Sequence, residues 1–203
     1  GSGPVELAAK ATEELDELGA LVEADGASAS IRIAEDYPWL ALCRSAIHDG
    51  AELVLAGKRS AADRGRRQIG GTAVKLLRKC PAPVWLVKPE HDLNYRHVLA
   101  CTDFSAVTDE LLSTSAWLAA QSSGELHLLH AWNLTWSEQR AAADLSEDDY
   151  TARVEEARAR ALASLERQAD VLDVDPTLHL ERGDPHVQIL EKVEQERPDL
   201  LVL

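Results

Sequence analysis

The sequence predicts two open α/β domains in tandem, each built on a parallel β-sheet with helices on both faces. Short apolar runs rich in β-branched residues alternate with helical stretches along all 203 residues, which is the order typical of βαβ units. In addition, residues 31–56 align without a gap with residues 178–203, and Pro38 falls opposite Pro185. An internal repeat at this spacing predicts two similar domains.

The first domain is expected over residues 4–90. Its apolar, β-branched runs predict strands, and the stretches between them have the apolar spacing of helices. We expect strands over residues 29–34, 51–56 and 83–89, and helices over 38–50 and 71–80. Pro38 suits the first position of its helix, because its fixed φ is helical and its missing N–H has no partner there in any case.

The second domain is expected over residues 96–203, after a polar linker at 91–95. Asp184 is the expected N-cap of the helix that begins at Pro185. We expect strands over residues 96–104, 125–132, 177–183 and 199–203, and helices from Ser105 or Ala106 to about Ser122, from Glu138 to about Ala169, and over 185–196.

The repeat also predicts which part of each domain the chain contains. The first domain has no counterpart of residues 97–133, so it corresponds to the C-terminal portion of a complete domain. The second ends at Leu203, directly before its counterpart of Gly57, and corresponds to an N-terminal portion. We therefore expect a tandem protein that is truncated at both ends.

Composition narrows the class of partner. The formal net charge is −14, and residues 91–203 carry 22 Asp/Glu against 9 Lys/Arg. Such a surface repels nucleic acid and anionic membranes, and we expect neither as a partner. The chain contains only three cysteines and no Cys-x-x-Cys pair, which favours a reducing cytosol over a disulfide framework.

Four passages together resemble the universal stress protein family, and specifically its tandem two-domain E-type. They are HVLACTDFS at 97–105, RGDPHVQILEKVEQERPDLLVL at 182–203, AGKRSAADRGRRQIGGT at 56–72 and LLRKCPAPVWLVKP at 76–89. The resemblance implies a Rossmann-like fold of the adenine-nucleotide α-hydrolase type. It also implies a cytosolic stress-response module that holds ATP, with Mg²⁺, or another adenine nucleotide at the carboxyl ends of its strands. We expect no catalytic residues and at most weak ATP hydrolysis.

In the first domain, the resemblance implies that the loop from Gly57 to Thr72 holds phosphates. The family motif is G-x2-G-x9-G-[ST]. Gly57 matches its first glycine, Ser60 stands at the second, and Gly71 with Thr72 matches the final pair after one extra residue; Gly70 precedes them. Backbone N–H groups and the next helix N-terminus would bind the phosphates. The alternative is a solvated surface loop.

In the second domain, the resemblance places two residues near the adenine and ribose. Asp103 matches the aspartate after the first strand, and Ala131 stands where a small apolar residue contacts adenine through its backbone. The alternative for Asp103 is a role in capping the next helix together with Ser105.

No metal site or catalytic group is expected from residue spacing. His127 and His130 lie three apart on a predicted strand, so their side chains point to opposite faces. The other histidines show no ligand spacing and are expected at the surface or in interfaces; they are His48, His91, His97, His179 and His186. The chain has no G-x-S-x-G, H-E-x-x-H, Walker A or G-x-G-x-x-G motif.

Two alternatives to nucleotide binding remain open. In the first, the chain is an interaction scaffold whose domains pair through their final strands, within one chain or in a homodimer, with residues 83–89 as the pairing edge. In the second, loop 57–72 and strand 83–89 complete the sheet of the second domain.

Overall fold

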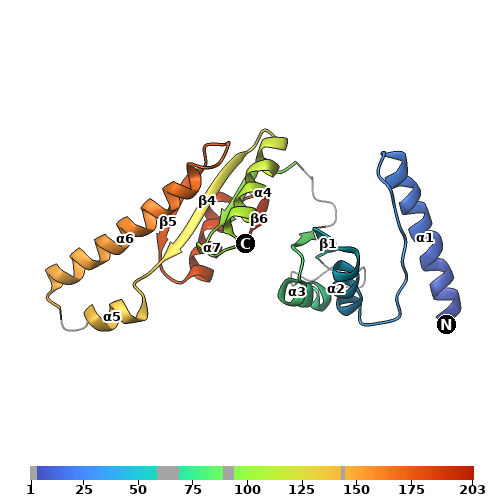
Figure 1. Ribbon diagram of the computed structural model, residues 1–203, viewed down its shortest axis with the longest axis horizontal. Helices are drawn as coiled ribbons and strands as arrows, with labels where there is room; N and C mark the ends of the chain where they lie inside the picture. Colours follow the sequence, from blue (N-terminus) through green and yellow to red (C-terminus); the bar gives the residue numbers. More distant parts are fainter. Residues whose placement is uncertain (1–3, 59–68, 89–93, 143–144) are drawn as a thin grey trace. The chain divides into compact units, whose positions relative to one another are not determined.

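The computed structural model describes residues 4–58, 69–88, 94–142 and 145–203. The chain divides into two compact units, Gly1–His91 and Asp92–Leu203 (Figure 1). Both contain a parallel sheet with helices, which confirms the predicted fold class. The position of the domain boundary stays a prediction. None of the described helices combines the length and the apolar character that a membrane span requires.

The first unit contains a two-stranded parallel sheet. Its elements are α1 (Pro4–Ala24), α2 (Pro38–Asp49), β1 (Val54–Gly57), α3 (Gly71–Lys79) and β2 (Val84–Val87). The register pairs Val54 with Val84 and Gly57 with Val87. Helices α2 and α3 contribute the buried residues Cys43, Ala46, Ala73 and Leu76. Helix α1 is an element that the apolar periodicity did not predict.

The strand predicted over residues 29–34 is wrong. These residues belong to no helix or strand, and Ile31 and Ile33 are 41% and 44% exposed. The counterpart of this segment in the second unit is a strand paired with its neighbour, whereas β1 and β2 are the only strands among the described residues of the first unit. The backbone N–H and C=O groups of a strand need partners on a neighbouring strand. Neither β1 nor β2 pairs with residues 29–34, so this segment does not form a strand. Arg32 instead bonds to Asp49 at 3.0 Å.

The second unit contains a four-stranded parallel sheet in the order β5-β4-β3-β6. Its elements are β3 (His97–Cys101), α4 (Thr108–Gln121), β4 (Glu125–Trp132), α5 (Trp136–Ala142), α6 (Glu147–Ala169), β5 (Thr177–Arg182), α7 (Pro185–Glu196) and β6 (Leu200–Val202). In the alignment of the internal repeat, the first and last residues of α7 fall opposite the first and last residues of α2. Asp184 caps it by accepting a hydrogen bond from the His186 N–H, as predicted.

The two faces of the second sheet are covered by different helices. Trp132 and Leu180 pack with Val154 and Ala157 of α6, so α6 covers the face formed by even-numbered β4 residues. Helix α7 covers the opposite face, where its Lys192 pairs with Glu181 at 2.8 Å. Crossover connections between parallel strands are right-handed. The connection to β5 and the connection to β6 run in opposite directions along the sheet, so their helices lie on opposite faces.

The long helix expected from Glu138 to about Ala169 is two helices. Helix α5 begins at Trp136, and α6 begins after Ser146, whose hydroxyl accepts a hydrogen bond from the Asp149 N–H. An N-cap of this kind starts a new helix. The Arg160 guanidinium lies 2.6 Å from the Glu138 carboxylate and ties the two helices together.

The proposal that strand 83–89 completes the second sheet is also wrong. Among the described strands, β2 pairs with β1, while β3 pairs with β4 and β6.

Candidate functional site

A cavity of about 230 Å³ opens at the carboxyl ends of the strands in the second unit. The chain leaves β3 toward β4 on one side, and reaches β6 on the other side through α7. In open α/β sheets this reversal of strand order leaves a crevice, and ligands bind in it. The volume is slightly below the roughly 300–1,000 Å³ of most small-molecule sites. Side chains that line it include Thr102, Asp103, Leu111, Leu129, Ala131 and Ile189.

Asp103 lies in the turn that follows β3, at the rim of this cavity. Its Oδ1 accepts a hydrogen bond from the Ser105 N–H at 2.9 Å. Hydrogen bonds from the Ser105 side chain and backbone hold the pKa of Asp103 below its usual range, and His130 adds a smaller electrostatic contribution. Helix α4 begins at Thr108 with Val107 at its N-cap position, so Asp103 does not cap it. The carboxylate is ionised and exposed beside the cavity.

A hydrogen-bond network around Thr102 fixes the shape of this turn. The Thr102 hydroxyl accepts from the Phe104 N–H at 3.1 Å, donates to Gln168 of α6 at 3.1 Å and lies 3.2 Å from the Thr108 hydroxyl. His130 Nδ1 donates to the Thr102 carbonyl at 2.8 Å. The Phe104 backbone adopts a φ of 61°, which is strained for a residue with a side chain. This network could not be predicted from the sequence, because no local pattern marks Gln168 or Thr108.

Ala131 and Asp103, both predicted from the resemblance, line the same cavity. Ala131 is near the end of β4 and pairs in register with Glu181 of β5. Its short side chain leaves space between the strand end and α7. The structure therefore brings the two predicted residues of the second unit together.

The predicted loop residues of the first unit also come together. Gly57 ends β1, and the Gly70 N–H donates to the Lys58 carbonyl at 2.9 Å, so both ends of the loop meet. Gly71 and Thr72 form the first turn of α3, whose N–H groups have no partner within the helix. Ser60 lies outside the described residues, as do the arginines at 64, 66 and 67.

His97 and His179, which show no ligand spacing in the sequence, both lie beside His127 in the structure. His127 Nδ1 lies 2.8 Å from His179 Nε2, and the His97 and His127 rings are 4.2 Å apart between centroids. His130 contacts Thr102 and Phe104 instead, as expected for a residue on the other face. Parallel pairing brings together residues that are far apart in the sequence, and spacing along one strand cannot reveal this.

Cys101 lines the cavity, and burial raises the pKa of its thiol to about 12. Since the thiolate is the reactive form, we expect iodoacetamide at pH 8 to alkylate Cys101 in the folded chain roughly a hundredfold or more slowly than in urea. Mass spectrometry of the peptide that contains Cys101 measures both rates. Equal rates in the folded and unfolded chain would contradict this prediction.

The fold and the cavity define an α/β protein with a ligand crevice at the carboxyl ends of parallel strands. The sequence model of the universal stress protein family matches residues 2–88 and 94–203. The chain therefore belongs to the universal stress protein family, with two such domains in tandem.

Solved structures show the same fold. A universal stress protein from Archaeoglobus fulgidus DSM 4304 is 22% identical with a TM-score of 0.62, over 97% of this chain and 66% of that one. A protein from Pseudomonas aeruginosa UCBPP-PA14, described as belonging to the same family, is 20% identical with a TM-score of 0.66, over 94% of this chain and 66% of that one. The chain thus spans slightly less than two thirds of each. A comparison with curated proteins finds no match.

Proposed function

We propose that this chain is a stress-response regulatory module that binds ATP, or another adenine nucleotide, in the cavity of its second unit. The observation that carries the proposal is that Asp103 and Ala131 line one cavity at the reversal of strand order. The proposed role is binding, with at most slow hydrolysis of ATP, in the cytosol.

The chemistry of the cavity suits a nucleoside. Leu111, Leu129 and Ile189 provide apolar walls for a flat base. The Asp103 carboxylate can accept hydrogen bonds from ribose hydroxyls, as acidic side chains near strand ends do in dinucleotide-binding folds. The Ser105 N–H holds this carboxylate, and the Thr102 network holds the turn, before a ligand arrives, which lowers the entropic cost of binding.

We further propose that the loop from Gly57 to Thr72 binds phosphate groups. A Cβ placed on Gly71 would meet no atom of the described residues within 4 Å, so none of these residues blocks the first turn of α3. The positive end of the helix dipole and the first-turn N–H groups favour an anion there. Replacing Thr72 with valine removes a hydroxyl donor and should weaken the binding of inorganic tripolyphosphate by the first unit.

Equilibrium dialysis of the full chain against ATP with Mg²⁺ tests the main proposal. We expect saturable binding at or below millimolar ATP. Asp103→Asn should weaken it about tenfold or more, because a hydrogen bond to a charged group contributes about 1.5–3 kcal/mol. Ala131→Phe should abolish it by filling the cavity.

Asp109→Asn is the matched control, because Asp109 is exposed in the first turn of α4 and does not line the cavity. It should bind ATP as the unchanged chain does. Absence of binding by folded protein at millimolar ATP would refute the proposal, and so would equal affinities of the Asp103 and Asp109 variants.

A second candidate function is a scaffold that dimerises through β2. Among the described strands, β2 has one neighbour, β1, and is an edge of its sheet. Unpaired edges can add a strand from a second copy. Sedimentation velocity distinguishes the candidates: a dimer without ATP binding favours the scaffold, and a monomer excludes it.

A further inference from the structure

Three histidines from three adjacent strands lie on one face of the second sheet. They are His97 of β3, His127 of β4 and His179 of β5. The register pairs Leu99 with His127 and Leu129 with His179, so each histidine lies two residues further along than the one before. Residues in register, and those two apart on a strand, point to the same face. The three imidazoles therefore form a diagonal row.

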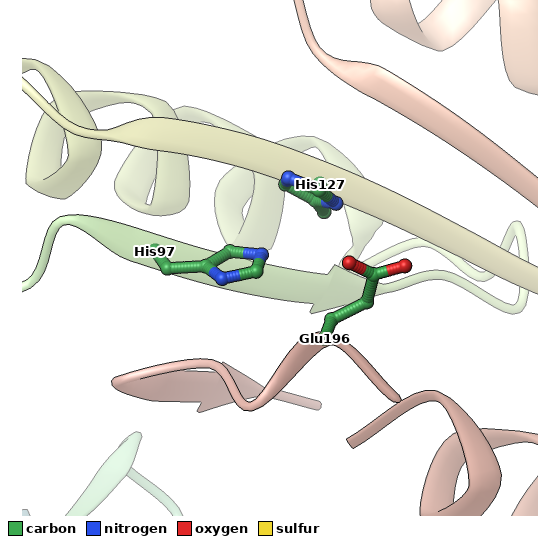
Figure 2. A group of neighbouring side chains, drawn as sticks. All are labelled: His97, His127 and Glu196. Atoms are coloured by element: carbon green, nitrogen blue, oxygen red, sulfur yellow. The ribbon is translucent and has the colours of Figure 1, made fainter. Parts of the chain in front are cut away.

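The last residue of α7 completes the group. One ligand atom each of His97, His127 and Glu196 lies within 4.8 Å of the other two. Figure 2 shows the Glu196 carboxylate directed toward the space beside the two imidazoles. Helix α7 covers this face of the sheet and runs back along it, so its C-terminus reaches the end of the sheet opposite the cavity.

One ring nitrogen of His97 has no hydrogen-bond partner within the described part of the chain. Its Nε2 is buried and makes no hydrogen bond to any described residue. A buried polar atom in this condition is rare, because it loses its bond to water without a replacement. A ligand at this position would satisfy it.

His127 is arranged as a metal-binding histidine commonly is. It is 8% exposed, and its Nδ1 contacts His179 Nε2 at 2.8 Å. When Nδ1–H donates to His179, the lone pair on Nε2 of His127 is available to a metal, and the second histidine orients the first.

Hydrogen bonds hold the start of β3 beside the turn that follows α7. Asp199 Oδ2 accepts hydrogen bonds from the N–H groups of Arg96 and His97 at 3.1 and 3.0 Å. The Asp199 N–H in turn donates to the His97 carbonyl at 2.8 Å. Arg197, with a φ of 50°, ends α7 directly after Glu196. The turn from Glu196 to Asp199 therefore keeps Glu196 beside His97.

We propose that His97, His127 and Glu196 form a binding site for a divalent transition-metal ion, with zinc as the expected occupant. Two imidazoles and one carboxylate are ligands that Zn²⁺ accepts, and three protein ligands leave a position for water. The ion would connect the C-terminus of α7 to β3 and β4 and stabilise the second unit. The site is separate from the nucleotide cavity and does not depend on it.

The test is a zinc titration of the metal-free full chain in competition with a chromophoric chelator. We expect one Zn²⁺ per chain and a higher melting temperature with the metal bound. His97→Gln and Glu196→Gln should each weaken zinc binding by about tenfold or more. His48→Gln is the matched control: His48 is exposed in the first unit, and its replacement should leave the affinity unchanged.

Circular dichroism of the metal-free variants shows whether they fold. Independently of any variant, imidazole ¹⁵N spectra of the unchanged chain, which has seven histidines, should show zinc-dependent shifts at His97 and His127. Absence of stoichiometric zinc binding would overturn the proposal. So would folded variants that bind as the unchanged chain does, or shifts confined to other histidines.

Discussion

Replacing Leu128 with alanine is expected to lower the free energy of unfolding of the second unit by about 2–5 kcal/mol. Leu128 is fully buried, and its strand, β4, is bonded to β3 on one side and β5 on the other. Because both neighbouring strands hold the backbone in place, the structure cannot close around the missing methyl groups. The cost should therefore lie in the upper half of this range.

Leu190→Ala is the matched control, because Leu190 is 60% exposed on α7 of the same unit. Its free-energy change should stay within about 0.5 kcal/mol. Hydrogen exchange of the amides in residues 125–132 during urea unfolding reports on the second unit separately from the first. Equal losses from the two substitutions would mean that Leu128 is not in a rigid core.

Gly124→Ala is expected to destabilise the second unit by about 3 kcal/mol, at the upper end for an overpacked position. A Cβ at residue 124 would lie 2.5 Å from the carbonyl oxygen of Arg96 and 2.6 Å from its Cα. These are backbone atoms, so no side chain can turn away. The Glu125 N–H also donates to the same carbonyl at 2.7 Å, and this bond would have to lengthen or break as β3 and β4 separate.

Gly71→Ala provides the comparison, since a Cβ there would meet no atom of the described part of the chain within 4 Å. This variant should be as stable as the unchanged chain or slightly more so, because alanine favours a helix over glycine. Urea unfolding measured on both variants checks the difference. Gly124→Ala should also weaken zinc binding, because Arg96 directly precedes His97. Equal stability of the two alanine variants would contradict the steric argument.

Much of the fold could be predicted because its signals are local. Asp184 followed by Pro185 marks the start of α7, and the repeat transfers the same bounds to α2. The break between α5 and α6 was missed although Ser146 is a recognisable cap, since the charged residues around it continue the helical pattern. The boundary between α5 and α6 is therefore marked by a local signal, the Ser146 cap.

The candidate cavity could be predicted only in part. Asp103 and Ala131 were found because they stand at positions of a family pattern, and the structure brings them to one cavity. The hydrogen bond between Thr102 and Gln168, which fixes the turn, joins β3 to a helix 66 residues away. Such a contact has no signature in either segment alone.

The sequence by itself determined the alternation of strands and helices and the repeat, because both depend on neighbours along the chain, whereas Asp103 and Ala131 were implied by the resemblance to the family. Only the tertiary structure decided that residues 29–34 form no strand, since strand formation depends on an adjacent partner rather than on β-branched residues. It likewise decided that His97, His127 and Glu196 meet. The register of parallel strands and the return of α7 across the sheet bring these three side chains together, and neither is encoded in their spacing.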